Sequence, residues 1–364
     1  MKILFGADVV PTAKVEQQFM DAKVEELFHD VADLMKQADR VMINLECALT
    51  TSENAIPKIG PNLKANPACV NTLKAVGVTD VALSNNHVFD FGTEGLRDTM
   101  ATLEEAGIPY TGVGENDTDS RKPYFIEQDG KKVAVINVCE HEYTYALPDR
   151  LGANPFDPFL TMRDIRAAKK DADYLVVLYH GGKEQCEYPS PRLRNLCQEM
   201  IHNGADVVLT QHSHCIGCYE EYEGGHILYG QGNFHFCHLS DKLPANWFTG
   251  LLVELEITDK LAIKFIPFWS DDESIMLAKD EKYDEIMDAF NARSEELHNG
   301  KWLDGWHDFC VEREESYRKM AGAIGIATPE TWEKQKQKFA HYLDCEAHTD
   351  VWRELYKTWN YTNK

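Results

Sequence analysis

The stretch "DVALSNNHVFDFG" occupies residues 80–92 and joins an apolar run to a group of polar side chains. The run stops at Asn85, Asn86 and His87, which either form a turn or line a site at the end of a strand. Similar runs recur along the chain, and segments with helical spacing separate several of them. They are KILF (2–5), RVMINL (40–45), KVAVINV (132–138), YLVVLY (174–179), DVVLT (206–210) and HILYG (226–230). Near-continuous apolar strands that alternate with helices indicate an α/β fold with strands buried on both faces.

The helices that we expect between these strands span residues 22–38, 68–76, 95–106 and 193–203. Residues 250–269 instead alternate between apolar and polar side chains around a "TDK" turn, which predicts an antiparallel hairpin. After about residue 275 the chain consists of long charged segments with helical periodicity. Five of the seven tryptophans fall there: Trp302, Trp306, Trp332, Trp352 and Trp359. We therefore predict a main domain over residues 1–270 and a helical C-terminal extension over residues 271–364, which packs on the main domain or on a second subunit.

The charge of the chain limits what it can bind. The formal net charge is −23, which argues against binding of duplex nucleic acid or an anionic membrane through an overall positive potential. An anionic substrate would need a local source of positive charge, such as metal ions. The apolar part of the N-terminus is too short for a signal peptide, and no window approaches the roughly 20 apolar residues of a membrane span. We expect a cytoplasmic protein whose ten scattered cysteines are free thiols.

Polar residues with metal-binding side chains follow five of the apolar runs. They are Asp8, Glu46, Asn86 with His87, His180, and His212 with His214. Because the carboxyl ends of parallel strands meet at one edge of a sheet, these side chains should converge. Each has another explanation by itself, since Asp8 could cap a helix, Asn85 could be a turn residue and His180 could be a partly buried ring. The joint pattern favours a metal site, and its oxygen and nitrogen donors suit one or two ions of zinc, manganese or iron.

The motifs also resemble those of a known family. "GAD" (6–8), "NLE" (44–46), "LSNNHVFDFG" (83–92), "HGGKE" (180–184), "GADVVLTQHSH" (204–214) and "YGQGNF" (229–234) occur in that order. Together they resemble the bacterial capsule-synthesis CapA family, which includes poly-γ-glutamate capsule proteins and belongs to the calcineurin-like metallophosphoesterase superfamily. The resemblance covers about residues 2–255. It implies a four-layer α/β/β/α sandwich of metallophosphoesterase type with the metals at the strand ends.

The resemblance also implies individual roles. Asp8 and His214 would bind a first metal, Glu46 would bridge, and Asn86, His180 and His212 would bind a second metal. His87 would be the catalytic proton donor. One departure stands out, because the superfamily usually begins with Asp-x-His and this chain has Asp8-Val9-Val10. The first metal would therefore lack one imidazole.

Residues around these motifs have more than one interpretation. Asp90 could orient His87 or cap the helix that follows, and the cap is the interpretation that we favour. Glu184 could hold a ligand histidine, while Lys183, Arg192 and Arg194 could bind substrate anions or lie on a solvated surface. Asn233 should line the site or close a hairpin. Asn85 should lie beside the site, and His235 and His238 should be partly buried histidines that bind no metal.

The leading functional hypothesis is a metal-dependent hydrolase that acts on a phosphoester. Two cations can lower the pKa of a bridging water and neutralise the charge that develops in an in-line displacement. One alternative is a non-hydrolytic accessory role in poly-γ-glutamate capsule assembly, and another is hydrolysis of γ-glutamyl amides at the same site. The expected partners are a small anionic or phosphorylated substrate or polyglutamate, together with a second copy of the chain through the C-terminal helices.

Overall fold

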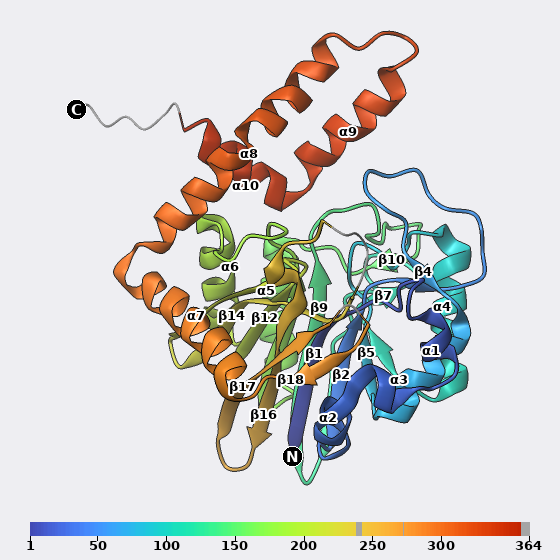
Figure 1. Cartoon of the computed structure of the whole chain (residues 1–364), viewed down its shortest axis with the longest axis vertical. Coiled ribbons are helices and arrows are strands. Elements are labelled where there is room, and N and C mark those ends of the chain that lie inside the picture. Colours follow the sequence, from blue (N-terminus) through green and yellow to red (C-terminus); the bar gives the residue numbers. More distant parts are fainter. Residues whose placement is uncertain (238–241, 272, 358–364) are drawn as a thin grey trace.

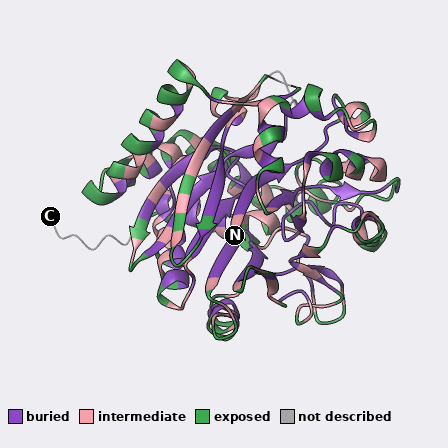
Figure 2. Cartoon of the chain, turned by 90° about the horizontal axis from the view of Figure 1, so that it is seen from below, coloured by how far each residue is buried: buried purple, intermediate pink, exposed green. Residues whose placement is uncertain are grey.

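Two β-sheets packed face to face form the centre of the molecule, and helices cover their outer surfaces (Figure 1). The structure is a computed structural model that describes residues 1–237, 242–271 and 273–357. His238 and Trp359, which the sequence analysis names, lie outside the described residues. Seen from below, the strands at the centre are mostly buried and the exposed residues lie mainly on helices and loops (Figure 2).

The first sheet has the strand order β18-β17-β16-β1-β2-β5-β6, and β15 also pairs with β1. Strands β1, β2, β5 and β6 run parallel, whereas β16, β17 and β18 are antiparallel to their neighbours. The bounds are β1 (Lys2–Val9), β2 (Arg40–Leu45), β5 (Asp80–Ala82), β6 (Tyr110–Thr111), β15 (Asn233–His235), β16 (Thr249–Ile257), β17 (Leu261–Ser270) and β18 (Ile275–Leu277). The hairpin expected over residues 250–269 is thus confirmed as β16 and β17.

The second sheet has the order β13-β14-β12-β11-β9-β8, with parallel pairing from β9 through β14. Its strands are β8 (Tyr124–Gln128), β9 (Lys131–Cys139), β11 (Tyr174–His180), β12 (Val207–Gln211), β13 (Ile216–Tyr222) and β14 (Gly225–Gln231). Two short ladders lie outside the sheets and consist of β3 (Ala48–Leu49) with β4 (Lys64–Ala65), and β7 (Val113–Gly114) with β10 (Gly152–Ala153).

The alternation of side chains along each strand separates three layers of core. In β1, Ile3 and Phe5 face the second sheet and pack with its Val176, whereas Leu4 faces the helices. The helices over the first sheet are α1 (Glu16–Met20), α2 (Val24–Lys36), α3 (Val70–Val76) and α4 (Gly92–Ala106). Those over the second sheet are α5 (Pro158–Lys169) and α6 (Pro191–His202). The four-layer α/β/β/α sandwich is confirmed, and the four expected helices lie within a few residues of their predicted bounds.

The chain after residue 270 continues the sheet before it becomes helical. Strand β18 pairs with β17, and α7 (Asp280–Asn299) packs on β13 and places Phe290 in the core between the sheets. Helices α8 (Trp302–Gly325), α9 (Trp332–Asp344) and α10 (Glu346–Leu355) then form a bundle above the carboxyl ends of the parallel strands (Figure 1). The domain boundary at residue 270 stays a prediction.

Two further features concern the state of the cysteines and the presence of membrane-spanning helices. All ten cysteines are free, as expected, and the structure shows that all of them are also buried. Among the described residues, no helix combines the length and the apolar character that crossing a bilayer requires.

Candidate metal centre

The five polar strand ends meet at one place on the rim of the two sheets. Donor atoms from four of these ends form two groups, Asp8 with Glu46 and His180, and Glu46 with His212 and His214, and within each group the atoms lie within 4.8 Å of one another. Asn86, from the fifth end, lies with Oδ1 3.0 Å from His180 Nε2. The convergence expected from the sequence is therefore present. Glu46 belongs to both groups, as a bridging carboxylate would. The grouping differs from the one that the resemblance implies, so the division of ligands between two ions stays a prediction.

The carboxylate of Glu46 is the clearest sign of a missing partner. The residue is fully buried, and neither of its oxygens has a hydrogen bond within the described part of the chain. His180 Nε2 lies 3.2 Å from Oε1 but is bonded instead to Asn86 Oδ1 at 3.0 Å. A buried carboxylate without partners is costly, by several kcal/mol even after relaxation. The donors present therefore fit a divalent cation.

The charges in this donor set perturb one another strongly. Burial and the negative charge of Glu46 raise the pKa of Asp8 above its usual range. Burial also acts to raise the pKa of Glu46, but the imidazoles of His180 and His214 outweigh it and lower that pKa to about 2. Glu46 is thus the carboxylate that stays ionised most readily, which suits a metal ligand.

The backbone around the two histidines after β12 is strained. His212 has φ +80° and His214 has φ +56°, the left-handed region that residues other than glycine rarely adopt. Such conformations cost about 1–3 kcal/mol each and persist where the surroundings fix them, often at functional sites. Here the His212 amide donates to Asp8 Oδ2 at 3.3 Å, and His214 Nδ1 lies 2.8 Å from Asn233 Oδ1. Asn233 therefore lies against a proposed ligand and fixes the orientation of the His214 ring.

Three side chains of the "SNNH" segment have different structural roles. Asn85 is fully buried, and its Oδ1 accepts from the backbone amides of His87 and Val88, so it holds the turn. Asn86 turns Oδ1 toward His180 and donates from Nδ2 to Glu142 Oε2 at 3.0 Å. His87 lines a cleft beside the donor set. The turn and the site are therefore the same structure.

The favoured interpretation of Asp90 is wrong. Helix α4 has Phe91 at its N-cap and no capping bond from a side chain. Asp90 instead lies with Oδ2 2.6 Å from His87 Nδ1, and it also accepts from Lys58 Nζ at 2.6 Å and from the Leu63 amide at 2.7 Å. A carboxylate bonded to one ring nitrogen fixes the orientation of the imidazole. Asp90 is thus the residue that positions His87, because the loop carrying Lys58 folds back onto it.

The cleft over Asn86 and His87 has a volume of about 230 Å³. Lys183 lines it, and its ammonium group forms no hydrogen bond or ion pair with any described residue, so its charge is available to an anion. Glu184 also lines the cleft and is exposed, and no described residue hydrogen-bonds to it. Desolvation in the cleft acts to raise its pKa, but the charges of Lys183, His212 and His214 outweigh it and lower that pKa, so its role beside the histidines stays a prediction.

The two arginines expected near this strand end are occupied elsewhere. Arg192 donates from Nε to Asp350 at 2.9 Å and from a terminal nitrogen to Glu140 at 2.8 Å. Arg194 is paired with Glu220 at 2.7 Å. Both expectations, substrate binding and a solvated surface, are wrong for Arg192, because the C-terminal extension supplies a buried carboxylate that the sequence could not place.

His235 is buried more deeply than the sequence predicts, and the first motif offers no second donor. His235 is fully buried against Phe19 and Phe28, and burial lowers its pKa to about 4. Val10 is 2% exposed within the core under the first sheet, so this position offers no donor to a metal. The absence of an imidazole there is a real departure from the Asp-x-His pattern.

The sequence analysis missed a sixth strand end. Strand β9 is followed by Glu140, His141 and Glu142, and Glu142 Oε1 lies 3.5 Å from His212 Nε2. Burial acts to lower the pKa of His212, but Glu142 outweighs it and raises that pKa to about 10. The signal was present, since "KVAVINV" ends in the same way as the other runs. His341 and His348 of the C-terminal extension also line the cleft, and no local pattern indicates that.

Comparison with known proteins agrees with these motifs. The profile described as "Bacterial capsule synthesis protein PGA_cap" matches residues 2–237. The chain belongs to this family. It is 31% identical over 219 residues to the capsule biosynthesis protein CapA of Bacillus anthracis, which covers 58% of this chain and 53% of that protein. It is 29% identical over 238 residues to the PGA biosynthesis protein CapA of Bacillus subtilis (strain 168), covering 64% and 62%.

A more distant relative has a related description. The chain is 27% identical over 209 residues to a probable polyglutamine synthesis accessory protein of Mycobacterium tuberculosis, covering 54% of this chain and 55% of that protein. The matches thus span between about half and three-fifths of the relatives' lengths. The family match ends at residue 237, so it does not include the C-terminal extension of this PGA_cap protein.

Solved structures resemble the fold at low similarity. A hypothetical protein from Thermus thermophilus aligns with 74% of this chain and 100% of its own, at 17% identity and a TM-score of 0.46. The 5'-nucleotidase of Candida albicans aligns with 75% of this chain and 52% of its own, at 10% identity and a TM-score of 0.41. Both scores are below 0.5, so the fold assignment rests on the sheet topology described above.

Proposed function

We propose that this PGA_cap protein is a divalent-metal-dependent hydrolase that cleaves a phosphoester. The observation that carries the proposal is Glu46, whose two buried oxygens accept no hydrogen bond from the described residues at the centre of five converging strand ends. Asp8, Asn86, His180, His212 and His214 would complete the set of ligands. Bound zinc, manganese or iron would supply Lewis acidity and a nucleophile at neutral pH.

The remaining groups of the site support proton transfer and anion binding. His87 Nδ1 is held by Asp90, and no described residue bonds to Nε2, so Nε2 can hold the proton that a leaving oxygen needs. Lys183 would bind a substrate oxygen across the same cleft. Asn85 would keep His87 in place through its backbone amide.

A second candidate is an accessory role in poly-γ-glutamate assembly without hydrolysis. The printed names of the Bacillus relatives favour it, because they describe capsule or PGA biosynthesis. In that case the metal would hold carboxylates of the polymer or organise a complex. Hydrolysis of γ-glutamyl amides at the same centre would be a third outcome.

One set of measurements separates these functions. The purified protein is analysed for bound metals and then assayed, with added Mn²⁺, for release from a panel of phosphomonoesters and phosphodiesters and for cleavage of γ-glutamyl peptides. We expect bound metal and phosphoester turnover, both abolished in Glu46→Gln. As a matched control, Glu254→Gln changes a buried glutamate of the same sheet outside the donor set. Bound metal with amide cleavage alone would favour the third outcome, and absence of both activities would favour the assembly role.

A further inference from the structure

The C-terminal extension is fixed to the rim of the metal centre through the end of β9. His141 lies with Nδ1 2.7 Å from Glu346 Oε1, and its backbone amide donates to the other oxygen of that carboxylate. Glu142, which faces His212, accepts a bond from Cys345 Sγ at 3.2 Å. The strand end therefore contacts the metal donors and the extension at once. Helices α9 and α10 are held in a defined position next to the site.

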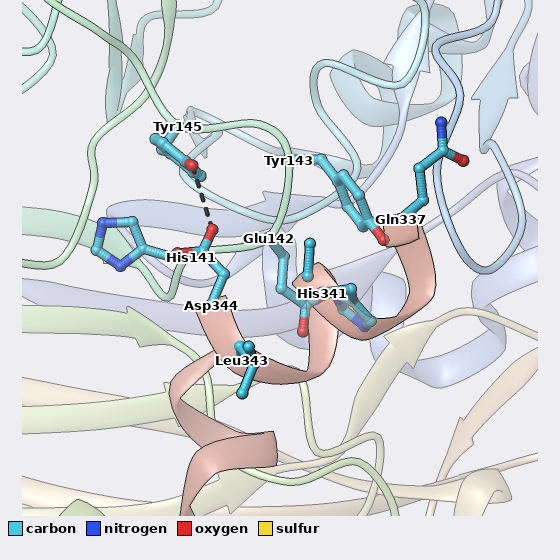
Figure 3. A pocket seen from close by; sticks show the side chains of 9 residues that line it. His141, Glu142, Tyr143, Tyr145, Gln337, His341, Leu343 and Asp344 are labelled. Carbon is cyan, nitrogen blue, oxygen red and sulfur yellow. Dashed lines mark hydrogen bonds between the residues drawn. The ribbon is translucent and has the colours of Figure 1, made fainter. Parts of the chain in front are cut away.

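This position creates a second cleft beside the first. It has a volume of about 530 Å³ and lies between residues 141–145 and helix α9 (Figure 3). Glu142 and His341 line both clefts, so the outer cleft begins one side chain away from the donor set. The two clefts are thus neighbours along the same face of the site.

The lining of the outer cleft is rich in rings. Tyr143 and His341 are stacked with centroids 5.2 Å apart and planes 19° from parallel, and His141 meets Tyr145 edge-on at 4.8 Å. Tyr143 is held there with φ +65°, a conformation that a bulky residue adopts at a cost. Leu343 is 58% exposed and adds an apolar side chain to the same wall. Faces and edges of aromatic rings bind flat groups well.

The charges around the outer cleft oppose a polyanion. Its formally charged lining residues are carboxylates, Glu142 and Asp344, and no lysine or arginine lines it among the described residues. Lys58, which lies 5.7 Å from the centre of the Tyr143 ring, is already paired with Asp90. The imidazole of His141 is paired with Glu346, and burial lowers the pKa of His341. Arg150 lies 5.6 Å from the centre of the Tyr145 ring, but its terminal nitrogen donates to the backbone carbonyls of Tyr143 and Tyr145. Along the described lining, a chain of carboxylates would therefore meet other carboxylates and no lysine or arginine.

We infer that the outer cleft binds an uncharged, planar organic group of the substrate, and that helix α9 is therefore a specificity element of the active site. The inference rests on the proposed function, because the phosphate of the same substrate would lie at the metal centre. It assigns to the C-terminal extension a role that the family match, which ends at residue 237, does not cover.

Binding of phosphonates that cannot be hydrolysed as esters tests this inference without any turnover. Methylphosphonate, phenylphosphonate and biphenylphosphonate are titrated into the Mn²⁺-loaded full chain by calorimetry. We expect at least one aryl compound to bind about tenfold tighter than methylphosphonate, a difference of about 1.4 kcal/mol. In Ala340→Trp, which fills the cleft from an exposed position of α9, that preference should disappear while methylphosphonate still binds. The matched control Ala101→Trp, at an exposed position of α4, should keep the preference.

The possible failures are distinguishable. Equal binding of all three phosphonates, or an aryl preference that survives in Ala340→Trp, would overturn the inference and leave the phosphoesterase proposal standing. Displacement of the aryl compound by oligo-γ-glutamate with loss of that competition in Ala340→Trp would also overturn it, because the cleft would then bind the polymer. If no phosphonate binds to the metal-loaded protein, both the inference and the proposed function are wrong.

Discussion

Arg192 of α6 joins the C-terminal extension to the second sheet. Its Nε donates to both oxygens of Asp350 in α10 at 2.9 Å, and a terminal nitrogen donates to Glu140 at the end of β9 at 2.8 Å. The side chains of Asp350 and Glu140 are 4% and 3% exposed. Replacing Arg192 with methionine keeps much of the length of the side chain and removes the charge. Glu140 then has lost its cation, and Asp350 keeps only Arg353, at 3.4 Å.

The cost of this change follows from the burial of both partners. Removing one member of a buried ion pair typically costs about 3–5 kcal/mol. Tyr179 still donates to Glu140 at 2.8 Å and Ser190 to Asp350 at 2.5 Å, and Arg353 remains 3.4 Å from Asp350. The charge left without a cation is therefore mainly that of Glu140. We therefore expect the free energy of unfolding to fall by about 3–5 kcal/mol. The first effect should be local opening of α10 away from the second sheet.

The variant should also respond to pH in a defined direction. Burial raises the pKa of Glu140 and of Asp350 even when Arg192 is present. Removal of Arg192 should raise both pKa values further. A carboxylate with a raised pKa binds more protons in the folded state than in the unfolded state, so stability falls as pH rises. The loss should begin near the unfolded values of about 4 and be complete above the raised folded values. Arg192→Met should thus be more stable at pH 5 than at pH 8.

Urea denaturation at both pH values and hydrogen exchange of α10 measure these effects. Arg194→Met is the matched control, because Arg194 lies on the same helix but pairs with Glu220 of β13, so its loss should not selectively raise exchange in α10. Adding Glu140→Gln and Asp350→Asn to Arg192→Met should recover much of the stability. A loss below about 1 kcal/mol with no dependence on pH would contradict the reasoning, since that is the range of an exposed ion pair.

The remaining predictions concern the site and the sheet. His87→Ala should keep its bound metal and lose about 10²–10⁴ in turnover, and an unchanged rate on phosphoesters would remove the proton-donor role. Glu46→Gln should lose most of its metal by elemental analysis, whereas Glu254→Gln should retain it; equal metal contents would argue against Glu46 as a ligand. Gly217→Ala would place a Cβ 1.4 Å from a carbonyl oxygen of β14, so its melting temperature should drop sharply, whereas Gly322→Ala in open space on α8 should be neutral or slightly stabilising.

Much of the fold was predictable from the sequence because the strands have a strong local signal. The runs at residues 2–5, 40–45 and 174–179 are almost wholly apolar, and in the structure they are buried on both faces. Their division into two sheets was not visible in the runs themselves. Ile3 and Leu4 are both apolar, although one faces the other sheet and the other faces helices. The four-layer arrangement was predicted from the family resemblance and not from the strand pattern.

Site residues that directly follow a strand could be predicted from the sequence. Site residues that reach the centre through tertiary packing, from distant loops or helices, could not. Asp8, Glu46 and His180 follow from one rule about strand ends, and Glu142 would have followed from the same rule. Lys58 lies in a loop that returns to Asp90, and nothing in "IPKIGP" indicates that contact. Asp90 was misinterpreted for the same reason, because its partners come from distant loops. His341 reaches the cleft only because α9 and α10 are attached to the end of β9.

The net charge of −23 makes anion binding a strict test of the metal centre. Near the donor set an anion would meet four carboxylates, Asp8, Glu46, Glu142 and Glu184, whereas Lys183 is the cation of the cleft lining whose side chain has no ion pair among the described residues. One unit charge at 4 Å repels another by about 4 kcal/mol at an effective dielectric constant of 20, so a single lysine cannot offset four carboxylates. Methylphosphonate should therefore bind the metal-loaded protein and fail to bind after treatment with a chelator, and binding should return when Mn²⁺ is added back. Equal binding with and without metal would mean that the protein attracts anions through groups other than this centre.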